Sequence, residues 1–575
     1  MKYFPKLLTV TWLKNSYRHN KLTPLEVAEE IVRRAKLTKD KNVYIIEPDL
    51  SWIKPYIDRL GEYDPETLPL WGIPFVIKDN IDLEGLPTTA GCPDYSYRPQ
   101  ESAAVVKKLI AAGAVPVGKA NLDQFATGLV GTRSPYGEVH NALKDELISG
   151  GSSSGSAVSV ALGQAAFSLG TDTAGSGRVP AALNALVGYK PSLGAWSTKG
   201  VVPACASIDC VTVFANNLDD VRLVNQIARG FDYDCSWSRE FPDIKEELPM
   251  KIFLVKNPEF YGPFKKIYQE KWDRAVSRIK SLEIPVEYPD DTIFKEAASI
   301  LYEGPWIAER WKDLGQFVNA NPGKVFPVTE SILRMGDRPE LTAAKLFEAL
   351  HKLQAYRAKV KVMLKDAVLI MPTAGGTYTR EEVRNNPVTP NLMMGNYTNH
   401  CNLLDMCAVA IPSEEEDRED PFGITVFGLS EAEGLVLGTA GKYQGMQTMQ
   451  VAVCGLHMQG FPLESQLVAL NAVFAEEAVT APYYRLYKLD TIPVKPGLIR
   501  VRNGHGILIE LYDLPVENFG KFINLVKAPL CIGDIMLEDG RTVKGFLCED
   551  YARETAEDIS VLGSFRNISP LGENC

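Results

Sequence analysis

"SGGSSSGSAVSVALGQAAFSLGTDTAGSGR", residues 149–178, places two clusters of serine and glycine on either side of an apolar segment. Because small and apolar residues fill the middle of this stretch, it predicts a buried helix followed by a strand rather than a solvated linker. Both clusters are therefore expected to be loops held by a core. No histidine occurs between Arg178 and His351, so a nucleophilic serine here would need a different base.

Composition limits the classes of function. The 575 residues suggest one large domain and a smaller one. A net charge of -11 argues against nucleic-acid binding, and no uncharged stretch is long enough to span a membrane. The ten cysteines are scattered without a C-x-x-C pair, which predicts reduced thiols in a cytoplasmic protein. The six histidines lack ligand spacing, so we expect neither a metal nor another cofactor.

The first 445 residues alternate between helical and strand patterns. Residues 21–36 predict a helix capped by Thr23, and the apolar run at 70–82 predicts a buried strand whose carboxyl end carries Lys78. Residues 101–128 predict helix, strand and helix, and residues 251–256 and 366–373 predict further strands. This rhythm indicates an α/β domain with a mixed central sheet flanked by helices.

A second domain is expected from residue 446 to residue 575. Residues 430–450 are rich in glycine and small side chains and are interpreted as the connection between the domains. Short strands are predicted at 451–458, 483–489, 498–504 and 506–514, with turns between them. The pattern favours a small α+β domain.

Within the opening stretch, Ser176 is a candidate nucleophile. A serine hydroxyl needs a base, and a lysine can serve if burial lowers its pKa enough to make it neutral. Lys78, at the end of a buried strand, is the candidate base, and Ser152 could relay the proton because a hydroxyl both donates and accepts. The turn at residues 172–177 could aim backbone N–H groups at an oxyanion.

Three motifs, "KDN" at Lys78, "GGSSSGSA" at 150–157 and "GTDTAGSGR" at 170–178, resemble those of the amidase signature family. The resemblance covers about residues 20–445. It implies that Lys78 is the base, that Ser152 is a relay serine with a cis peptide bond, and that Ser176 is the nucleophile. It also implies an oxyanion hole made by the backbone N–H groups of Thr173, Ala174, Gly175 and Ser176. Asp172 and Arg178 are expected to brace this loop as an ion pair.

The substrate is suggested by "LYEGPWIAERW" at 301–311. Tyr302 and Arg310 are eight residues apart, which would place them on one face of a helix, where the arginine could hold a carboxylate. This stretch and residues 453–467 resemble the allophanate-hydrolysing members of the family. That resemblance implies hydrolysis of allophanate (urea-1-carboxylate) through an acyl-enzyme, with Tyr302 and Arg310 binding the substrate. A homodimer, and fusion or coupling to a biotin-dependent urea carboxylase, are expected on the same basis.

The second domain offers a candidate site of its own. Residues 451–463 predict a strand that runs into a glycine-bounded turn, so backbone N–H groups near Gly455 and Gly460 could point at an anion. The segment resembles the substrate site of γ-glutamyl cyclotransferase-like folds. This resemblance implies a site with His457, Gln459 and Gly460 that assists decarboxylation of N-carboxycarbamate. The alternative is a structural His457 in a domain that only caps or dimerises the first.

Besides an amidase for another small amide, two other functions remain open from the sequence. One is an amidotransferase subunit that releases ammonia from glutamine for a partner, which would leave the second domain unexplained. The other is a scaffold derived from an amidase, which the presence of Lys78, Ser152 and Ser176 disfavours.

Overall fold

The computed structural model describes residues 2–61, 65, 67–414, 420–445, 448–470 and 472–568. The chain divides into two compact units, Met1–Trp272 with Ile284–Gly441 and Asp273–Glu283 with Lys442–Cys575. The division after Gly441 lies a few residues before the predicted boundary, whose first residue, Met446, is outside the described residues. No helix in the described ranges is long and apolar enough to cross a membrane.

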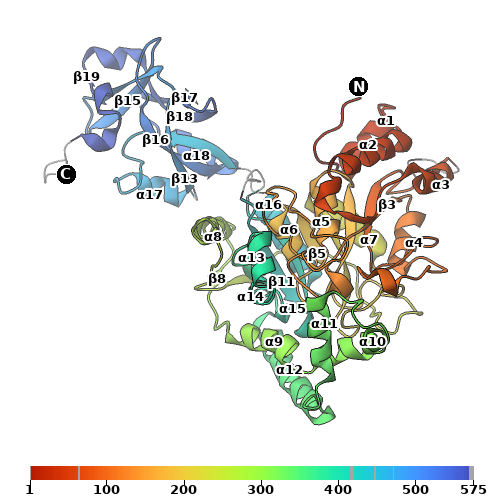
Figure 1. The fold of residues 1–575 in the computed structure, drawn as a ribbon. Coiled ribbons are helices and arrows are strands. Elements are labelled where there is room, and N and C mark those ends of the chain that lie inside the picture. The colour runs from red at the N-terminus through yellow and green to blue at the C-terminus, as the bar shows by residue number, and fades with distance from the viewer. Residues whose placement is uncertain are drawn as a thin grey trace. The chain divides into compact units, whose positions relative to one another are not determined.

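Unit 1 is built on a mixed sheet of eleven strands, flanked by helices as predicted (Figure 1). The strand order is β1-β3-β2-β4-β6-β5-β10-β11-β9-β7-β8. The bounds are β1 Tyr44–Ile46, β2 Pro74–Lys78, β3 Val115–Ala120, β4 Phe167–Asp172, β5 Val187–Lys190, β6 Cys210–Ala215, β7 Lys251–Leu254, β8 Val286–Glu287, β9 Ala367–Pro372, β10 Met406–Pro412 and β11 Gly423–Leu429.

The part of the sheet that matters for function is the group β3, β2 and β4. Strand β2 is parallel to both neighbours, with Ile77 opposite Lys119 on one side and Leu169 on the other. All residues of these three strands are buried. Since the carboxyl ends of parallel strands meet at one edge, Lys78 and the residues that follow β4 lie near each other.

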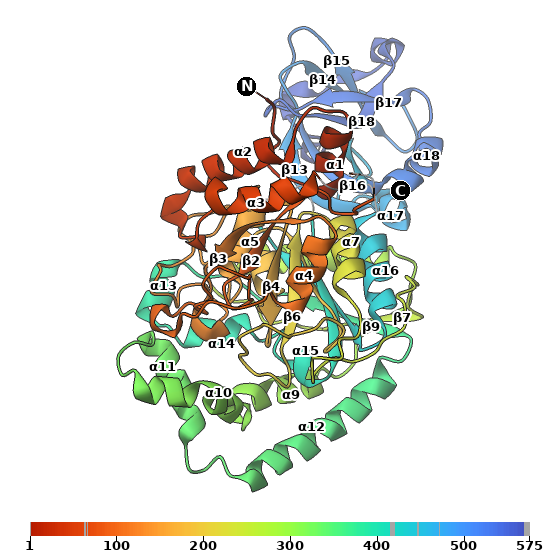
Figure 2. The same cartoon turned by 90° about the vertical axis from the view of Figure 1, so that its right-hand side faces the viewer.

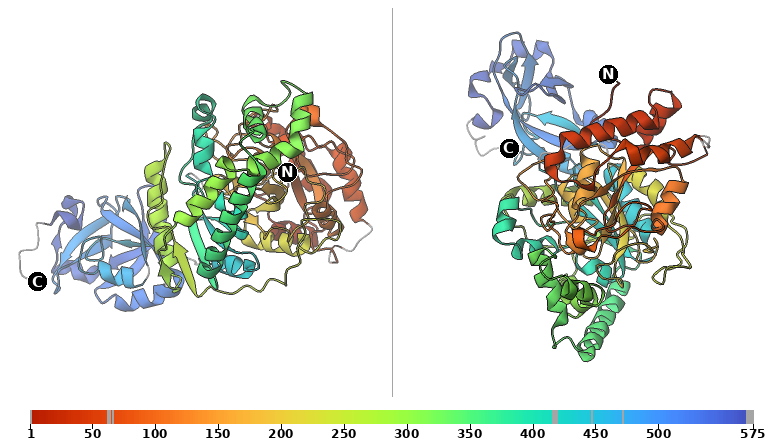
Figure 3. Two further views of the ribbon diagram at one scale, coloured as in Figure 1. Left: turned by 90° about the horizontal axis from the view of Figure 1, so that it is seen from below. Right: turned by 45° about the vertical axis from the view of Figure 1, so that its right-hand side comes forward.

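Helices surround this sheet (Figures 1 and 2), and two of those given below continue into unit 2, at Asp273 and at Lys442. Seen from below, helices α9 to α12 lie in front of the sheet and cover that end of the unit (Figure 3). The bounds are α1 Val10–Arg18, α2 Pro24–Leu37, α3 Leu50–Leu60, α4 Ala104–Ala111, α5 Ser154–Ala161, α6 Val179–Leu183, α7 Leu218–Ala228, α8 Lys265–Lys280, α9 Thr292–Glu303, α10 Trp306–Ala320, α11 Pro327–Arg334, α12 Ala343–Met363, α13 Arg380–Asn385, α14 Thr389–Met394, α15 His400–Leu403 and α16 Glu433–Gln444.

Local sequence signals account for several of these elements. Helix α2 begins with a capping box in which the Thr23 hydroxyl accepts from the Glu26 N–H and the Glu26 carboxylate accepts from the Thr23 N–H. The small residues of 154–161 form the wholly buried helix α5, and β4 follows it. The predicted helix and strand within the opening stretch are therefore confirmed.

One local prediction is wrong, and a second segment has more regular structure than its composition indicates. The helix expected before residue 128 is only a short 3-10 turn at Gln124–Ala126, where Phe125 and Ala126 have positive φ. The glycine-rich segment interpreted as a connection contains the division between the units, after Gly441, but most of it forms helix α16. Its glycines allow close packing, because a Cβ on Gly434 would lie 1.9 Å from the Lys245 carbonyl oxygen and one on Gly438 would lie 2.3 Å from that of Glu247.

Unit 2 is a β-rich α+β structure, which confirms the predicted class; its likeness to γ-glutamyl cyclotransferases stays a prediction. Five strands are ordered β13-β16-β12-β18-β17 and three are ordered β15-β14-β19. The bounds are β12 Thr448–Val453, β13 Val473–Val479, β14 Tyr484–Leu489, β15 Lys495–Arg500, β16 Leu508–Pro515, β17 Leu530–Met536, β18 Thr542–Cys548 and β19 Glu557–Asp558, with helices α17 Glu464–Ala469 and α18 Val516–Leu525.

Candidate active site

Lys78 is the last residue of β2 and is fully buried. Its Nζ donates hydrogen bonds of 2.8 Å to the hydroxyl oxygens of Ser152 and Thr171. Thr171 belongs to β4, the parallel neighbour of β2, and Ser152 belongs to the loop before α5. The sheet and this loop together hold the amine between two hydroxyl groups.

The surroundings of Lys78 favour its neutral form. Burial lowers the pKa of Lys78 from 10.5 to about 7, against the opposing effect of Asp123, Asp209 and Asp172. About half of the amine is then neutral at pH 7, compared with about one in three thousand for a lysine of pKa 10.5. The amine can therefore accept a proton near neutral pH.

The backbone of Ser152 is fixed by a hydrogen bond from Asp123. The Gly151–Ser152 peptide bond is cis, in agreement with the family resemblance. The Ser152 carbonyl oxygen accepts a 3.1 Å hydrogen bond from the Asp123 N–H. The Asp123 carboxylate in turn accepts from the N–H groups of Gly131 and Arg133. These contacts fix the direction in which the Ser152 hydroxyl points.

Ser176 lies four residues beyond the end of β4 and is 3% exposed. In the described part of the chain no hydrogen bond joins its hydroxyl to Ser152 or Lys78. Catalytic hydrogen bonds are often long without substrate and tighten when it binds, so this geometry does not exclude Ser176, and its role as nucleophile stays a prediction.

The loop after β4 is folded around a buried ion pair. Arg178 donates to both oxygens of Asp172, at 2.9 Å from Nε and 3.0 Å from Nη2, and both side chains are fully buried. Burial disfavours the Asp172 carboxylate, but Arg178, Lys190 and the Gly177 N–H together outweigh this effect and hold its pKa below the usual value. The predicted ion pair is confirmed.

The hydrogen bonds that the Asp172 carboxylate accepts change which N–H groups can form the expected oxyanion hole. Asp172 accepts hydrogen bonds from the N–H groups of Gly175, at 2.8 Å, and Gly177, at 3.0 Å. The Gly175 amide therefore has an internal partner and does not face a substrate. Among the described residues, the N–H groups of Thr173, Ala174 and Ser176 donate to no other group, so these three stay as candidate oxyanion donors.

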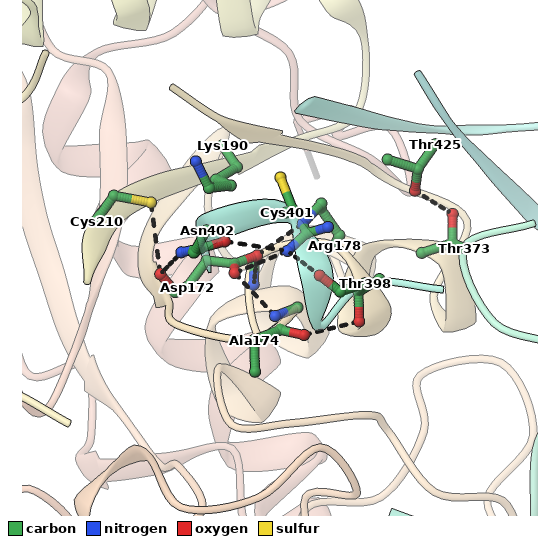
Figure 4. A network of polar contacts seen from close by, with 12 residues as sticks. Asp172, Ala174, Arg178, Lys190, Cys210, Thr373, Thr398, Cys401, Asn402 and Thr425 are labelled. Atoms are coloured by element: carbon green, nitrogen blue, oxygen red, sulfur yellow. Dashed lines mark hydrogen bonds and ion pairs between the residues drawn. The ribbon is translucent and has the colours of Figure 1, made fainter. Parts of the chain in front are cut away.

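A distant segment holds the loop from behind (Figure 4). The Thr398 hydroxyl donates to the Ala174 carbonyl oxygen at 2.7 Å. The Asn402 amide, on α15, donates to the carbonyl oxygens of Asp172 and Ile208, both at 2.8 Å. The nucleophile loop is thus fixed by residues more than 200 positions away in the sequence.

The structure corrects the single helix expected for Tyr302 and Arg310. Tyr302 lies in α9 and Arg310 in α10, and the chain is extended at Gly304 between them. Pro305 explains the break, because a proline disfavours helical backbone at the preceding residue. The Tyr302 side chain is outside the described residues.

Arg310 itself lies in the neighbourhood of the nucleophile loop. It is 4% exposed, and its Nη1 donates to the Thr127 hydroxyl at 3.0 Å. Arg310 also acts on Asp209, whose carboxylate accepts a hydrogen bond from the Thr173 hydroxyl. Burial raises the pKa of Asp209 to about 6, and the Thr173 hydrogen bond and the charge of Arg310 oppose this rise. A buried guanidinium near the oxyanion donors is suited to binding a small anionic substrate.

In unit 2, His457 follows β12 and faces a cavity of about 200 Å³ that Gln466, Lys495 and Lys527 also line. Its Nε2 lies 3.0 Å from the Gln466 Oε1, and its ring stacks on Phe546. Burial lowers the pKa of His457, which Gln466 opposes. A neutral imidazole beside two lysines is chemically suited to an anionic ligand.

The amides expected to join His457 do not face this cavity. The Gln459 N–H donates to Glu510 at 2.8 Å, and the Gly460 N–H donates to Glu464 at 2.7 Å. Both amides stabilise the turn itself because neighbouring carboxylates accept their hydrogen bonds. Of the three residues predicted for the second site, His457 lines this cavity, whereas Gln459 and Gly460 are not among its lining residues, and a role of any of them in a second site stays a prediction.

Several residues of the site were not singled out from the sequence. They are Thr127, Thr171, Asp123, Asp209, Thr398 and Asn402. Only Thr171 stood inside a recognised motif. The others are isolated polar residues in ordinary stretches, and only the fold brings them to the nucleophile loop.

In the described ranges no group of three or more histidine, cysteine, aspartate or glutamate side chains could hold a metal ion.

Two family models match this chain. One, described as Amidase, covers residues 26–437, and one described as the allophanate hydrolase C-terminal domain covers residues 449–569. The urea amidolyase of Saccharomyces cerevisiae is 40% identical over 87% of this chain and 30% of its own length. A glutamyl-tRNA(Gln) amidotransferase subunit from Methanosarcina acetivorans is 46% identical over 35% of this chain and 41% of its own.

Solved structures extend the likeness to both units. An allophanate hydrolase from Kluyveromyces lactis is 37% identical, with a TM-score of 0.71 over 98% of this chain and 99% of that one. The urea amidolyase of the same organism gives the same identity and TM-score, but 37% of its chain is covered. The present chain thus spans about a third of the length of the urea amidolyases that it matches.

Proposed function

We propose, since this chain belongs to the amidase family and is a hydrolytic amidase, that it hydrolyses allophanate to ammonia and carbon dioxide in the breakdown of urea. The observation that carries the proposal is a buried lysine with a pKa of about 7, bonded to Ser152 at the edge of the sheet where the loop of Ser176 begins. Similarity to an allophanate hydrolase over 98% of the chain supports the choice of substrate.

In this mechanism Ser176 attacks the carbonyl carbon of the terminal amide. Its proton passes to Lys78 through the Ser152 hydroxyl, and the N–H groups of Thr173 and Ala174, with that of Ser176, bind the oxyanion. The ammonia leaves after receiving a proton from the same relay. Water then attacks the acyl-enzyme, again with Lys78 as base, and releases N-carboxycarbamate.

Arg310 is proposed to bind the carboxylate of allophanate together with Tyr302. Its burial and its contact with Thr127 support this role, since a buried guanidinium binds a carboxylate more strongly than an exposed one does. A neutral amide of the same size would gain nothing from this contact. The arrangement therefore selects for a small substrate with a negative charge.

Unit 2 is proposed to assist decarboxylation of N-carboxycarbamate. The cavity with His457, Lys495 and Lys527 supports this role, because cationic side chains attract a dianion and a neutral imidazole can exchange a proton. The same contacts fit the alternative hypothesis. In it His457, stacked on Phe546, is structural, and unit 2 only caps or dimerises unit 1.

We further propose a homodimer in the cytoplasm, supplied with allophanate by a biotin-dependent urea carboxylase to which the chain is fused or coupled. The length of the urea amidolyases, of which this chain spans 30%, supports a joined carboxylase. The nine described cysteines are all free, which supports a reducing compartment.

The deciding experiment is to incubate the chain with allophanate and, separately, with glutamine, and to measure ammonia from each. We expect release from allophanate alone. Release from glutamine alone would replace this proposal by that of a glutamine-dependent amidotransferase, and release from neither would favour a scaffold. A Ser176→Ala variant controls for spontaneous release of ammonia from the substrate in each incubation.

A further inference from the structure

The segment 204–209, just before β6, has no part in the mechanism above, yet it contacts the nucleophile loop. Its last residue, Asp209, is 7% exposed. One carboxylate oxygen of Asp209 accepts from the N–H groups of Ala204, at 2.7 Å, and Cys205, at 3.0 Å. The other accepts from the Thr173 hydroxyl. Asp209 therefore joins its own segment to a loop whose amides are candidate oxyanion donors.

The opposite side of this segment is bonded to helix α10. The Ser207 N–H and hydroxyl donate to the two oxygens of Glu309, at 2.8 and 2.6 Å. The Cys205 Sγ donates to the Trp306 carbonyl oxygen at 3.7 Å. Glu309 immediately precedes Arg310, the proposed binder of the substrate carboxylate. Segment 204–209 is thus bonded to the helix that carries Arg310 and to the loop that carries Ser176.

A second link strengthens the connection with the nucleophile loop. The Asn402 side chain donates both to the Ile208 carbonyl oxygen and to that of Asp172. The two stretches are therefore joined at Asp209 through a side chain and near Ile208 through Asn402. Figure 4 shows Asn402 directed at Asp172 from the side of α15.

We propose that Asp209 is a positioning residue, which holds Thr173 so that the oxyanion amides stand at the correct place relative to Arg310. The inference rests on the proposed function for the identity of the substrate. Asp209 touches neither substrate nor the attacking oxygen; it acts through the Thr173 hydroxyl on one side and through segment 204–209 and α10 on the other.

The expected effect is on the transition state. An oxyanion exists only after Ser176 has attacked, so a displaced Thr173 amide weakens the transition state and leaves ground-state binding nearly unchanged. Misplacement by about 1 Å costs about 100-fold in rate in well-ordered sites. A role limited to folding would instead change stability, or binding and turnover together.

The test compares Thr173→Val, which keeps the shape and removes the donor to Asp209, with Thr173→Ser, which keeps the donor. Turnover is measured as ammonia release from allophanate and from propionamide. Binding of allophanate is measured by calorimetry in a Ser176→Ala background, with and without Thr173→Val. Thr439→Val is the matched control, because Thr439 is a buried threonine on α16 whose hydroxyl donates to the Leu435 carbonyl oxygen.

We expect Thr173→Val to lower kcat about 10- to 100-fold, as for loss of a hydrogen bond to a buried charge, while Kd changes less than about threefold. Thr173→Ser should retain most of the wild-type kcat, and Thr439→Val should lower kcat less than about twofold. The inference is overturned if Thr173→Val leaves kcat unchanged, if Thr173→Ser loses as much, or if Kd weakens by the same factor as kcat.

Failure of the proposed function gives a different result. In that case wild-type protein releases no ammonia from allophanate. The ratio of kcat between Thr173→Val and wild type is then measured with propionamide. Because an oxyanion forms with any amide, the same ratio is expected there, and its absence counts against Asp209 alone.

Discussion

Replacing the buried lysine by methionine should inactivate the protein and at the same time stabilise it near neutral pH. The unfolded chain holds a proton on Lys78 up to about pH 10.5, whereas the folded chain releases it at about pH 7. Between these values the unfolded state binds more protons, so lowering the pH through this window weakens folding. This loss of unfolding free energy is absent above pH 10.5 and reaches about 4 kcal/mol at pH 7.

Lys78→Met removes this cost but also removes two hydrogen bonds, to Ser152 and Thr171. Each such bond contributes about 1 kcal/mol. The variant should therefore gain about 2 kcal/mol in unfolding free energy at pH 7, and the gain should shrink with rising pH and reverse above about pH 9. Ammonia release should fall at least about 100-fold, because the variant loses the amine that is bonded to the Ser152 hydroxyl.

The assay is urea unfolding of the full chain at pH 7, 8, 9 and 10, following the transition of unit 1. Lys190→Met is the matched control. Lys190 is also fully buried, and burial disfavours its charge, but Cys210, Cys401 and Asp172 outweigh that effect and raise its pKa. Its loss should destabilise the protein at every pH. The reasoning is refuted if Lys78→Met destabilises as Lys190→Met does, or if its effect does not vary with pH.

Four further outcomes are expected. The rate of ammonia release should rise with pH through an apparent pKa of about 7, since Lys78 must be neutral to act as base; a flat profile between about pH 5 and 9 would count against it. Ser176→Ala should leave the fold intact and less than about a tenth of the activity, and more than that would exclude Ser176 as nucleophile. Arg310→Met should weaken kcat/KM for allophanate by about 2–4 kcal/mol and spare a neutral amide, whereas equal losses on both substrates would make Arg310 structural. His457→Ala should slow carbon dioxide evolution without changing the first ammonia release, and an unchanged time course would leave unit 2 without this role.

The parts of the fold that could be predicted are those that depend on nearby residues. The capping box of Thr23 and Glu26 lies within four positions, and the buried strand ending at Lys78 is a short apolar run. The opening stretch was also predictable, because its small residues permit the wholly buried helix α5. In each case one segment of sequence contains all the interactions that decide its local structure.

The rest depended on contacts between distant residues or on signals with two meanings. Asp209 and Asn402 hold the nucleophile loop from 36 and 230 positions away, and nothing in their own stretches indicates that they do so. The glycines of α16 indicate flexibility in isolation, but here they allow residues 245–247 to pack closely. The Gly304–Pro305 pair did carry a usable signal, since proline disfavours a helical residue before it.

The way the site satisfies its carboxylates explains how Lys78 can stay neutral. Asp123, Asp172 and Asp209 all favour a charged lysine, and together they could restore the pKa that burial lowers. Each of them instead accepts hydrogen bonds from at least two backbone N–H groups of its own loop, and Asp172 also has Arg178. These donors neutralise part of each negative charge and shape the three loops around the amine. Because the same bonds that fold the loops also weaken their field at Lys78, burial remains the largest effect on its pKa, and the base is available at neutral pH.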